Sequence, residues 1–231
     1  MREPLIIGHR GASAVAPENT IAAFEAAIAA AADGVEFDVR LSSDGVPVII
    51  HDDTLQRTHG LRRRVGDLTA EELRAVDVPT LRDLFELMLH NDLLLCLEIK
   101  GSSAQLAQRC CDLVREFAFE ERVIVECFDL HVLKLVDLTT AALFEPRIYT
   151  DKNLIERAIE VGASVLALHH RLAKPQLVEK AKLAGLRVVV WTVDDPVWIE
   201  RARSLGIEAV ITNHPARMIE ASDRLRVQLN R

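Results

Sequence analysis

The feature that most constrains the fold is a repeated unit, in which a helix-like segment ends at a glycine and an apolar run follows at once. It recurs as VGASVLALHH around Gly162, AGLRVVVWTV around Gly185 and LGIEAVITNH around Gly206, and AADGVEFDV around Gly34 matches it. Glycine suits the first position after a helix, where φ is positive. The apolar runs show no clean alternation, as in strands that are buried on both faces. The repeat therefore predicts strand–helix units that build a parallel sheet.

Counting these units along the chain gives a set of strands that can close on itself. The expected strands are residues 5–9, 34–39, 93–99, 122–128, 141–145, 164–168, 187–192 and 208–212. Eight parallel strands with intervening helices form a (β/α)₈ or TIM barrel, for which about 250 residues is typical. The chain has 231 residues. Length alone also allows two smaller domains, but the strand count favours a single α/β barrel domain over residues 1–231.

The second expected strand departs from this rhythm. SSDG at 42–45 is a turn, and VPVII at 46–50 is a further strand. The connection is too short for a parallel crossover, so we expect an antiparallel hairpin that brings His51 back towards the level of Asp38. Residues 52–79 then form a short insertion of mixed charge before a helix at about 80–90. This insertion is either a surface loop or a cap over the active site, and the sequence leaves both open.

Charge and apolar patterning exclude several classes of protein. The net charge is −7 and the pI about 5.6, which argues against nucleic-acid binding through a broad basic face. No apolar run reaches the roughly 18 residues of a membrane span, so stable membrane insertion is not expected. Cys96, Cys110, Cys111 and Cys127 lack zinc-site spacing, and we expect free, buried thiols. Free thiols and the lack of a signal-like N-terminus favour a cytoplasmic location.

Three acidic residues stand in the expected strands near their carboxyl ends, where TIM barrels place their chemistry. Glu36 and Asp38 are two apart in VEFDV, so both side chains point to the same face. Glu98, in LLLCLEIK, adds a carboxylate from the neighbouring barrel strand. Three carboxylates without a cysteine ligand favour one divalent cation, Mg²⁺ or Ca²⁺. The alternative is a metal-free cluster in which Arg10 or Lys100 pairs with the carboxylates.

Two histidines and two cationic side chains flank these carboxylates. His9 and Arg10 end the first expected strand. His51 closes the hairpin, and Lys100 completes the sequence EIK. Histidine titrates near neutral pH and suits acid–base catalysis, whereas arginine and lysine bind phosphate oxygens. Carboxylates, a metal and fixed cations together predict a site for an anionic ester, most plausibly a phosphate ester.

These residues belong to motifs that follow one another in the order of a known family. The motifs are HRG at 9–11, PENT at 17–20, E-x-D at 36–38, DGVPVIIHD at 44–52, QRTHG at 56–60, EIK at 98–100, WTV at 191–193 and ITNHP at 211–215. From residue 5 to about 217 the chain resembles the glycerophosphodiester phosphodiesterases. Any one motif is weak, but the ordered set is highly specific.

The resemblance implies a role for each of the candidate residues. The three carboxylates would hold one divalent cation, Mg²⁺ or Ca²⁺. His9 would be the general base and His51 the general acid, while the two cationic side chains hold the phosphate. Trp191 would line the substrate pocket, and Phe128, in ECF at 126–128, would line it as well. The resemblance gives no role to His169, His170 or His214, and it leaves the oligomeric state open.

The resemblance also implies a small-molecule substrate, a glycerophosphodiester such as glycerophosphocholine. The products would be sn-glycerol 3-phosphate and an alcohol, formed through a cyclic phosphate after attack by the glycerol 2-hydroxyl. One alternative is a lysophospholipase D-like or sphingomyelinase-like enzyme on the same scaffold, but residues 52–79 show no apolar stripe for an acyl chain. The other is a non-catalytic binding protein. The presence of every charged strand-end residue argues against loss of catalysis.

Overall fold

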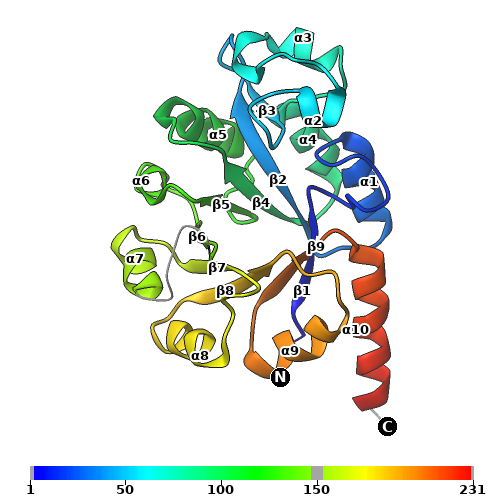
Figure 1. Ribbon diagram of the computed structural model, residues 1–231, viewed down its shortest axis with the longest axis vertical. Coiled ribbons are helices and arrows are strands. Elements are labelled where there is room, and N and C mark those ends of the chain that lie inside the picture. Colours follow the sequence, from blue (N-terminus) through cyan, green and yellow to red (C-terminus); the bar gives the residue numbers. More distant parts are fainter. Residues whose placement is uncertain (1–2, 147–152, 230–231) are drawn as a thin grey trace.

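The computed structural model describes residues 3–146 and 153–229, and within these ranges eight parallel strands form a closed barrel (Figure 1). The barrel strands are β1 (Leu5–His9), β2 (Gly34–Leu41), β4 (Leu94–Ile99), β5 (Val123–Cys127), β6 (Thr140–Phe144), β7 (Val165–His169), β8 (Arg187–Trp191) and β9 (Ala209–Thr212). Strand β1 pairs with both β9 and β2, which closes the circle. The predicted (β/α)₈ barrel is confirmed, and the strand ends agree with those predicted to within two residues.

The predicted hairpin is also confirmed. Strand β3 (Pro47–Ile49) pairs antiparallel with β2, with Val39 opposite Ile49 and Leu41 opposite Pro47. The return continues past the strand, since the Ile50 amide donates to the carbonyl of Asp38 at 2.9 Å. His51 therefore comes back to the level of Asp38, at the carboxyl end of the barrel.

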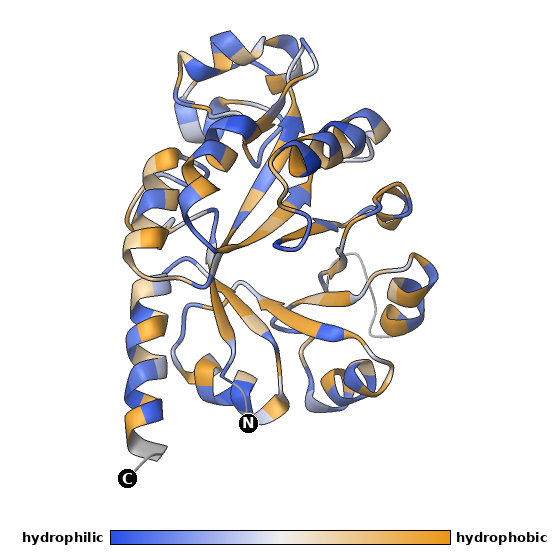
Figure 2. Ribbon diagram, turned by 180° about the vertical axis from the view of Figure 1, so that it is seen from behind, coloured by the Kyte–Doolittle hydropathy of each residue, from blue (hydrophilic) through white to orange (hydrophobic). Residues whose placement is uncertain are grey.

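The barrel buries apolar side chains on both faces of its sheet, which explains why its strands do not alternate. One cluster lies inside the barrel, and a larger cluster lies between the strands and the surrounding helices. In Figure 2 the strands are mostly apolar, whereas the helices carry apolar and polar stretches. Gly34 stands where β1, β2 and β4 approach closely, because an added Cβ atom would lie 2.4 Å from the Leu94 carbonyl oxygen. Close approach, rather than a positive φ, requires glycine there.

Helices follow the strands around the outside of the barrel (Figure 1). They are α1 (Ile21–Ala29), α4 (Leu81–Leu87), α5 (Ala104–Glu116), α6 (Leu130–Leu133), α7 (Leu154–Glu160), α8 (Pro175–Leu183), α9 (Val197–Leu205) and α10 (Pro215–Leu229). The predicted helix at 80–90 is α4 followed by the 3₁₀ turn η2 (Met88–His90). Thr80 caps α4 by accepting from the Asp83 amide, while the Asp83 carboxylate accepts from the Thr80 amide. This reciprocal cap stabilises the first turn.

The insertion at 52–79 has an apolar core of its own, lying at the end of the β2–β3 hairpin at the top of Figure 1. It contains α2 (Gln56–His59), the 3₁₀ turn η1 (Val65–Asp67) and α3 (Ala70–Arg74). The buried side chains of the insertion are spaced irregularly along the sequence. The sequence therefore showed no periodic pattern that would predict which of these residues are buried. The core residues are Val48, Ile50, Leu55, Val65, Leu68, Ala70, Leu73 and Val78.

The expectation of free, buried thiols is met by the described residues. Cys96, Cys110, Cys111 and Cys127 all lie in the described ranges, and each is buried and free. No helix in those ranges has the length and apolar content needed to cross a membrane.

Candidate active site

Most of the predicted site residues meet in one cavity of about 290 Å³ at the carboxyl ends of the barrel strands. Asp38 is the exception, because it is wholly buried behind the cavity wall. No residue from 52–79 is among the residues that line this cavity. The lining residues are His9, Arg10, Glu36, His51, Glu98, Lys100, Glu126, Phe128, Leu143, Glu145, Trp191 and Ile211.

The three predicted metal ligands converge. Glu36, Asp38 and Glu98 each offer a carboxylate oxygen, and these oxygens all lie within 4.8 Å of one another. The register explains the convergence, because Asp38 on β2 stands beside Glu98 on β4, and Glu36 points to the same face two residues earlier. All three side chains are buried. A set of three hard oxygen donors fits a hard divalent cation.

Two cationic side chains hold the deepest carboxylate. Lys100 Nζ lies 2.9 Å from Asp38 Oδ1 and also pairs with Glu98. Arg10 Nε lies 3.1 Å from Asp38 Oδ2, and the Asn19 side-chain amide donates to the same oxygen at 2.7 Å. Burial alone would raise the pKa of Asp38, but the charges of Lys100 and Arg10 outweigh burial and hold that pKa well below its usual range. Asp38 is therefore ionised.

The other carboxylates are held less firmly in their charged form. Burial, and then repulsion from Asp38, raises the pKa of Glu36 well above its usual value. Burial raises the pKa of Glu98 to about 7, although Lys100 acts in the opposite direction. Repulsion among buried carboxylates is what a bound divalent cation would relieve. The electrostatics and the donor geometry thus agree on a candidate cation site.

His9 is oriented by a chain of hydrogen bonds from the end of β9. Its Nδ1 donates to Asn213 Oδ1 at 2.7 Å, and Asn213 Nδ2 donates to Asp194 Oδ2 at 2.8 Å. This arrangement leaves Nε2 of His9 free on the side of Glu36, whose Oε2 lies 3.8 Å away. Burial, and then the charge of Arg10, lowers the pKa of His9 to about 4. The imidazole is therefore neutral at physiological pH.

His51 is oriented by a carboxylate instead of an amide. Its Nδ1 donates to Asp52 Oδ1 at 2.6 Å, and Arg57 Nε donates to Asp52 Oδ2 at 2.6 Å. Arg57 also binds Glu18, which accepts from Arg10 Nη1 at 2.7 Å. Burial, together with the charges of Lys100 and Arg10, lowers the pKa of His51, although Asp38 and the hydrogen bond to Asp52 act in the opposite direction. An ion-pair chain thus joins the insertion to the phosphate-binding candidate Arg10.

The HRG turn places Arg10 by an unusual backbone conformation. Arg10 has a φ of 54°, in the left-handed region, and its backbone amide donates to Glu36 Oε2 at 3.0 Å. Gly11 follows with a φ of 79°, and an added Cβ there would lie 2.5 Å from the backbone of Ala23. A non-glycine residue in the left-handed region costs free energy, and such strain is frequent at functional sites.

The side of the cavity opposite the carboxylates is aromatic and apolar. Phe128 and Trp191 meet edge to face with their ring centroids 5.7 Å apart. His169 packs edge to face on Trp191 at 5.2 Å, outside the residues that line the cavity. The two predicted aromatic residues therefore form a wall that suits the carbon face of a small ligand.

Sequence reasoning missed several residues of this site. Glu126 carried the same signal as Glu36, a carboxylate inside the apolar run VIVEC, and it stands beside Glu98 in the register of β4 and β5. Burial, and then repulsion from Glu98, raises the pKa of Glu126 to about 8. Asn213 and Asp52 were visible in ITNHP and DGVPVIIHD, but no local pattern indicates what they contact.

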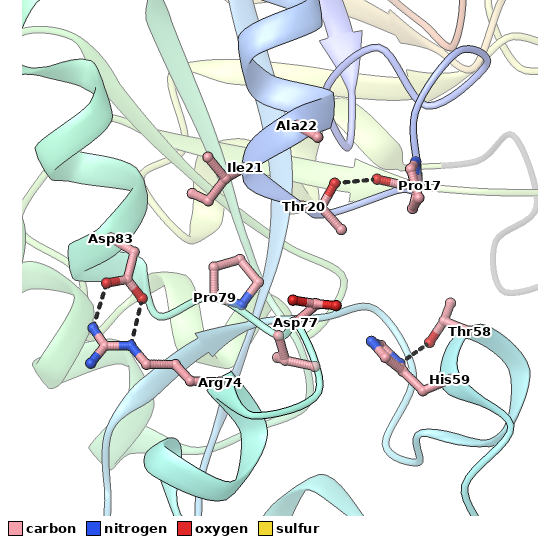
Figure 3. A pocket seen from close by; sticks show the side chains of 11 residues that line it. Pro17, Thr20, Ile21, Ala22, Thr58, His59, Arg74, Asp77, Pro79 and Asp83 are labelled. Carbon is pink, nitrogen blue, oxygen red and sulfur yellow. Dashed lines mark hydrogen bonds and ion pairs between the residues drawn. The ribbon is translucent and has the colours of Figure 1, made fainter.

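A second, larger cavity of about 630 Å³ lies between α1 and the insertion (Figure 3). Thr20, Asp77 and Pro79 are among its lining residues, and none of the predicted catalytic, substrate-binding or metal-binding residues is. In Figure 3 Arg74 pairs with Asp83 on one side of this cavity, and Thr58 contacts His59 on the other. The chemistry of the molecule is therefore concentrated in the smaller cavity.

The fold and the smaller cavity together define a TIM-barrel hydrolase built to act on a phosphate ester. Comparison of the sequence with known families makes this assignment specific. Residues 9–217 match the Glycerophosphoryl diester phosphodiesterase family, and the chain belongs to this family.

Relatives and solved structures of this family match nearly the whole chain. A glycerophosphodiester phosphodiesterase of Caldanaerobacter subterraneus subsp. tengcongensis is 35% identical over 93% of this chain and 96% of its own length. A Thermotoga maritima glycerophosphodiester phosphodiesterase superposes with a TM-score of 0.84 at 29% identity, covering 95% of this chain and 99% of that one. An Oleispira antarctica phosphodiesterase, solved with the product sn-glycerol-3-phosphate, gives a TM-score of 0.86 at 26% identity, covering 96% and 97%.

Proposed function

We propose that this chain hydrolyses glycerophosphodiesters to sn-glycerol 3-phosphate and an alcohol, with one metal-dependent site in a single barrel domain over residues 1–231. The convergence of three buried carboxylates beside two histidines and two cationic side chains is the observation that carries the proposal. Family membership supports the reaction class. The product found in the Oleispira antarctica relative supports sn-glycerol 3-phosphate as a product here. Four free cysteines support the cytoplasm as its location.

In the proposed site, Glu36, Asp38 and Glu98 hold one divalent cation, Mg²⁺ or Ca²⁺. Their oxygens lie close enough to share one ion, and no cysteine or histidine belongs to that group in the described residues. When bound, the cation stabilises negative charge on the phosphate oxygens as a Lewis acid. Lys100 and Arg10 already neutralise Asp38. These two side chains also bind phosphate oxygens, because they lie at the cavity wall.

His9 serves as the general base and His51 as the general acid. The neutral amide of Asn213 holds His9 with Nε2 free to accept a proton. The carboxylate of Asp52 stabilises the protonated form of His51, as a general acid requires. Both rings line the same cavity, so a phosphate held by Arg10 and Lys100 lies within reach of both.

The reaction proceeds in two proton-balanced steps. The glycerol 2-hydroxyl attacks phosphorus and gives its proton to His9, while the bond from phosphorus to the alcohol oxygen breaks and that oxygen takes a proton from His51. The product of this step is a cyclic phosphate. Water then opens the ring with the two histidines in reversed roles. Phe128 and Trp191 pack against the carbon chain of the substrate in both steps.

A substrate panel followed by phosphorus NMR tests this function. We expect purified protein to release sn-glycerol 3-phosphate from glycerophosphocholine or glycerophosphoethanolamine in the presence of Mg²⁺ or Ca²⁺. Thorough chelation should abolish the activity, and either cation should restore it. Preferential cleavage of lysophosphatidylcholine or sphingomyelin would replace the proposal with a lipid phosphodiesterase. Full activity after chelation would show that the carboxylates do not serve a metal.

A further inference from the structure

Glu126 is a buried carboxylate of the candidate active-site cavity, and it has no role in the proposed mechanism. It is 2% exposed and lines the cavity from β5. Within the described ranges its carboxylate has neither a hydrogen bond nor an ion pair, and its oxygens open onto the cavity, because they are not among the side-chain atoms closed off from solvent without a partner. Leaving a buried polar group without a partner costs free energy, and the cost is larger for a charged group. A ligand that displaces water from the cavity beside Glu126 must therefore offer the carboxyl group a polar partner.

The candidate metal site does not supply this partner. Glu126 stands outside the group of three carboxylates whose oxygens lie within 4.8 Å of one another. Its place in the barrel is one strand further round, because β5 follows β4 and Glu126 lies beside Glu98 in the register. The polar floor of the cavity thus extends past the cation site into the half that holds the organic part of the substrate.

Apart from Glu145, which follows β6, the surroundings of Glu126 in that half are apolar. Leu143, Phe128, Trp191 and Ile211 line the cavity from the strands β6, β8 and β9 and from the end of β5. A ligand that fits this half presents carbon to most of the wall and one polar group to Glu126. The cavity volume of about 290 Å³ lies at the lower end of the range for small-molecule pockets, which is about 300–1,000 Å³. A three-carbon polyol meets both requirements.

We propose that Glu126 determines specificity by binding the primary hydroxyl of the glycerol moiety, an inference that rests on the proposed function. The 2-hydroxyl is the nucleophile and the third glycerol oxygen is bonded to phosphorus, so the primary hydroxyl is the remaining polar group. A hydroxyl both donates and accepts a hydrogen bond. It therefore satisfies the Glu126 carboxyl group whether that group is ionised or protonated.

Two matched substrates test this assignment. One is glycerophosphocholine, and the other is its analogue in which hydrogen replaces the primary hydroxyl, which keeps the nucleophilic 2-hydroxyl. We expect the unmodified protein to prefer glycerophosphocholine in kcat/KM by about 10²-fold or more, as sites that bind a substrate hydroxyl reject the analogue that lacks it. Glu126→Leu should reduce this preference to about threefold or less, while Glu126→Gln retains part of it. Glu121→Gln, the same change on the exposed turn before β5, is the control.

Binding measurements separate this inference from the proposed function. In the presence of Ca²⁺, Glu126→Leu should weaken binding of glycerol 3-phosphate by about tenfold or more and leave inorganic phosphate binding unchanged. A preference that persists in Glu126→Leu, or equal losses for both ligands, would overturn the role of Glu126. Loss of Ca²⁺ binding in Glu126→Gln would overturn it as well, by making Glu126 a metal ligand. If the protein cleaves no glycerophosphodiester, the proposed function is wrong. The comparison of glycerol 3-phosphate with inorganic phosphate binding would still decide the role of Glu126.

Discussion

Nδ1 of His9 donates a hydrogen bond to Oδ1 of Asn213 at 2.7 Å, although the two residues are 204 positions apart in the chain. Asp194 fixes the amide from behind, because it accepts from both the backbone and the side-chain nitrogen of Asn213. The amide oxygen is therefore directed at His9, and the ring has one tautomer. Because the ring is held in this orientation, the neutral histidine presents Nε2 to a substrate without having to rotate first.

Replacing Asn213 should impair catalysis more than substrate binding. Asn213→Leu removes the acceptor for Nδ1, and we expect kcat to fall by about 10²-fold, the lower end of what a positioned acid–base group contributes. KM should change little, because Asn213 does not line the cavity. Asn213→Asp keeps an acceptor for His9 but sets a second carboxylate against that of Asp194, so it should recover only a small part of kcat. Steady-state kinetics on glycerophosphocholine would contradict this role if both variants lost activity through KM alone.

The two histidines should each be essential to turnover. His9→Ala and His51→Ala should each lower kcat by about 10²-fold or more, because each removes one proton-transfer group. Neither side chain belongs to an apolar core cluster, so both variants should fold. Circular dichroism and thermal unfolding provide the check on folding. A variant that is folded and retains more than about a tenth of kcat would remove that histidine from the mechanism.

A substrate without the 2-hydroxyl should bind and fail to react. Arg10 and Lys100 still hold its phosphate, but the neighbouring nucleophile is absent and its proximity advantage is lost. The measurement is product release by phosphorus NMR, together with competitive inhibition of glycerophosphocholine cleavage to prove binding. Turnover of the 2-deoxy analogue at a rate near that of the parent would rule out the cyclic intermediate and favour direct attack by water.

The stability of the chelated protein should depend on pH through Glu126. Burial raises the pKa of Glu126 to about 8 in the folded state. The Glu126 carboxyl group therefore contributes fully to stability below pH 4.5, the ordinary pKa of a glutamic acid side chain. Between these values the folded protein retains a proton that the unfolded chain has released, and stability falls as pH rises. Glu126→Gln should make this decline shallower, by at most about 1.4 kcal/mol per pH unit.

Urea unfolding of both proteins at several pH values between 5 and 8, with chelator present, measures this difference. Glu98 and Glu36 titrate in the same direction and His9 in the opposite one. Glu98 and Glu36 repel Glu126, so the comparison measures the titration of Glu126 together with its coupling to these two carboxylates. Parallel curves for the two proteins would show that Glu126 is ionised throughout this range.

A small change at Gly34 should destabilise the barrel. The added methyl group of Gly34→Ala would lie 2.4 Å from the Leu94 carbonyl oxygen, a contact that requires the backbone to shift. We expect a loss of about 1–3 kcal/mol in unfolding free energy, as for overpacking in other cores. Gly66→Ala is the matched control, since an added Cβ there meets nothing within 4 Å. If the two variants had the same midpoint of urea unfolding, the close approach of Gly34 to Leu94 would be contradicted.

Much of the fold could be predicted because its signals are local. Four of the strands are marked by a preceding glycine and an apolar run and the others by apolar runs alone, and eight such strands have a closed arrangement. The same locality placed Glu36, Asp38 and Glu98 at one end of the barrel. Residues 52–79 gave no such signal, because their small core is assembled from short helices and turns together with Val48 and Ile50 of the hairpin, and only the fold revealed it.

The sequence by itself determined the barrel, the family and the residues whose chemistry is costly to bury. The tertiary structure alone decided which of these residues touch. Closure of the barrel sets β9 beside β1 and so brings Asn213 to His9, while the hairpin brings Arg57 to Glu18. The parallel register of β4 and β5 sets Glu126 beside Glu98. Such contacts follow from chain closure and register over long separations, which no local periodicity encodes.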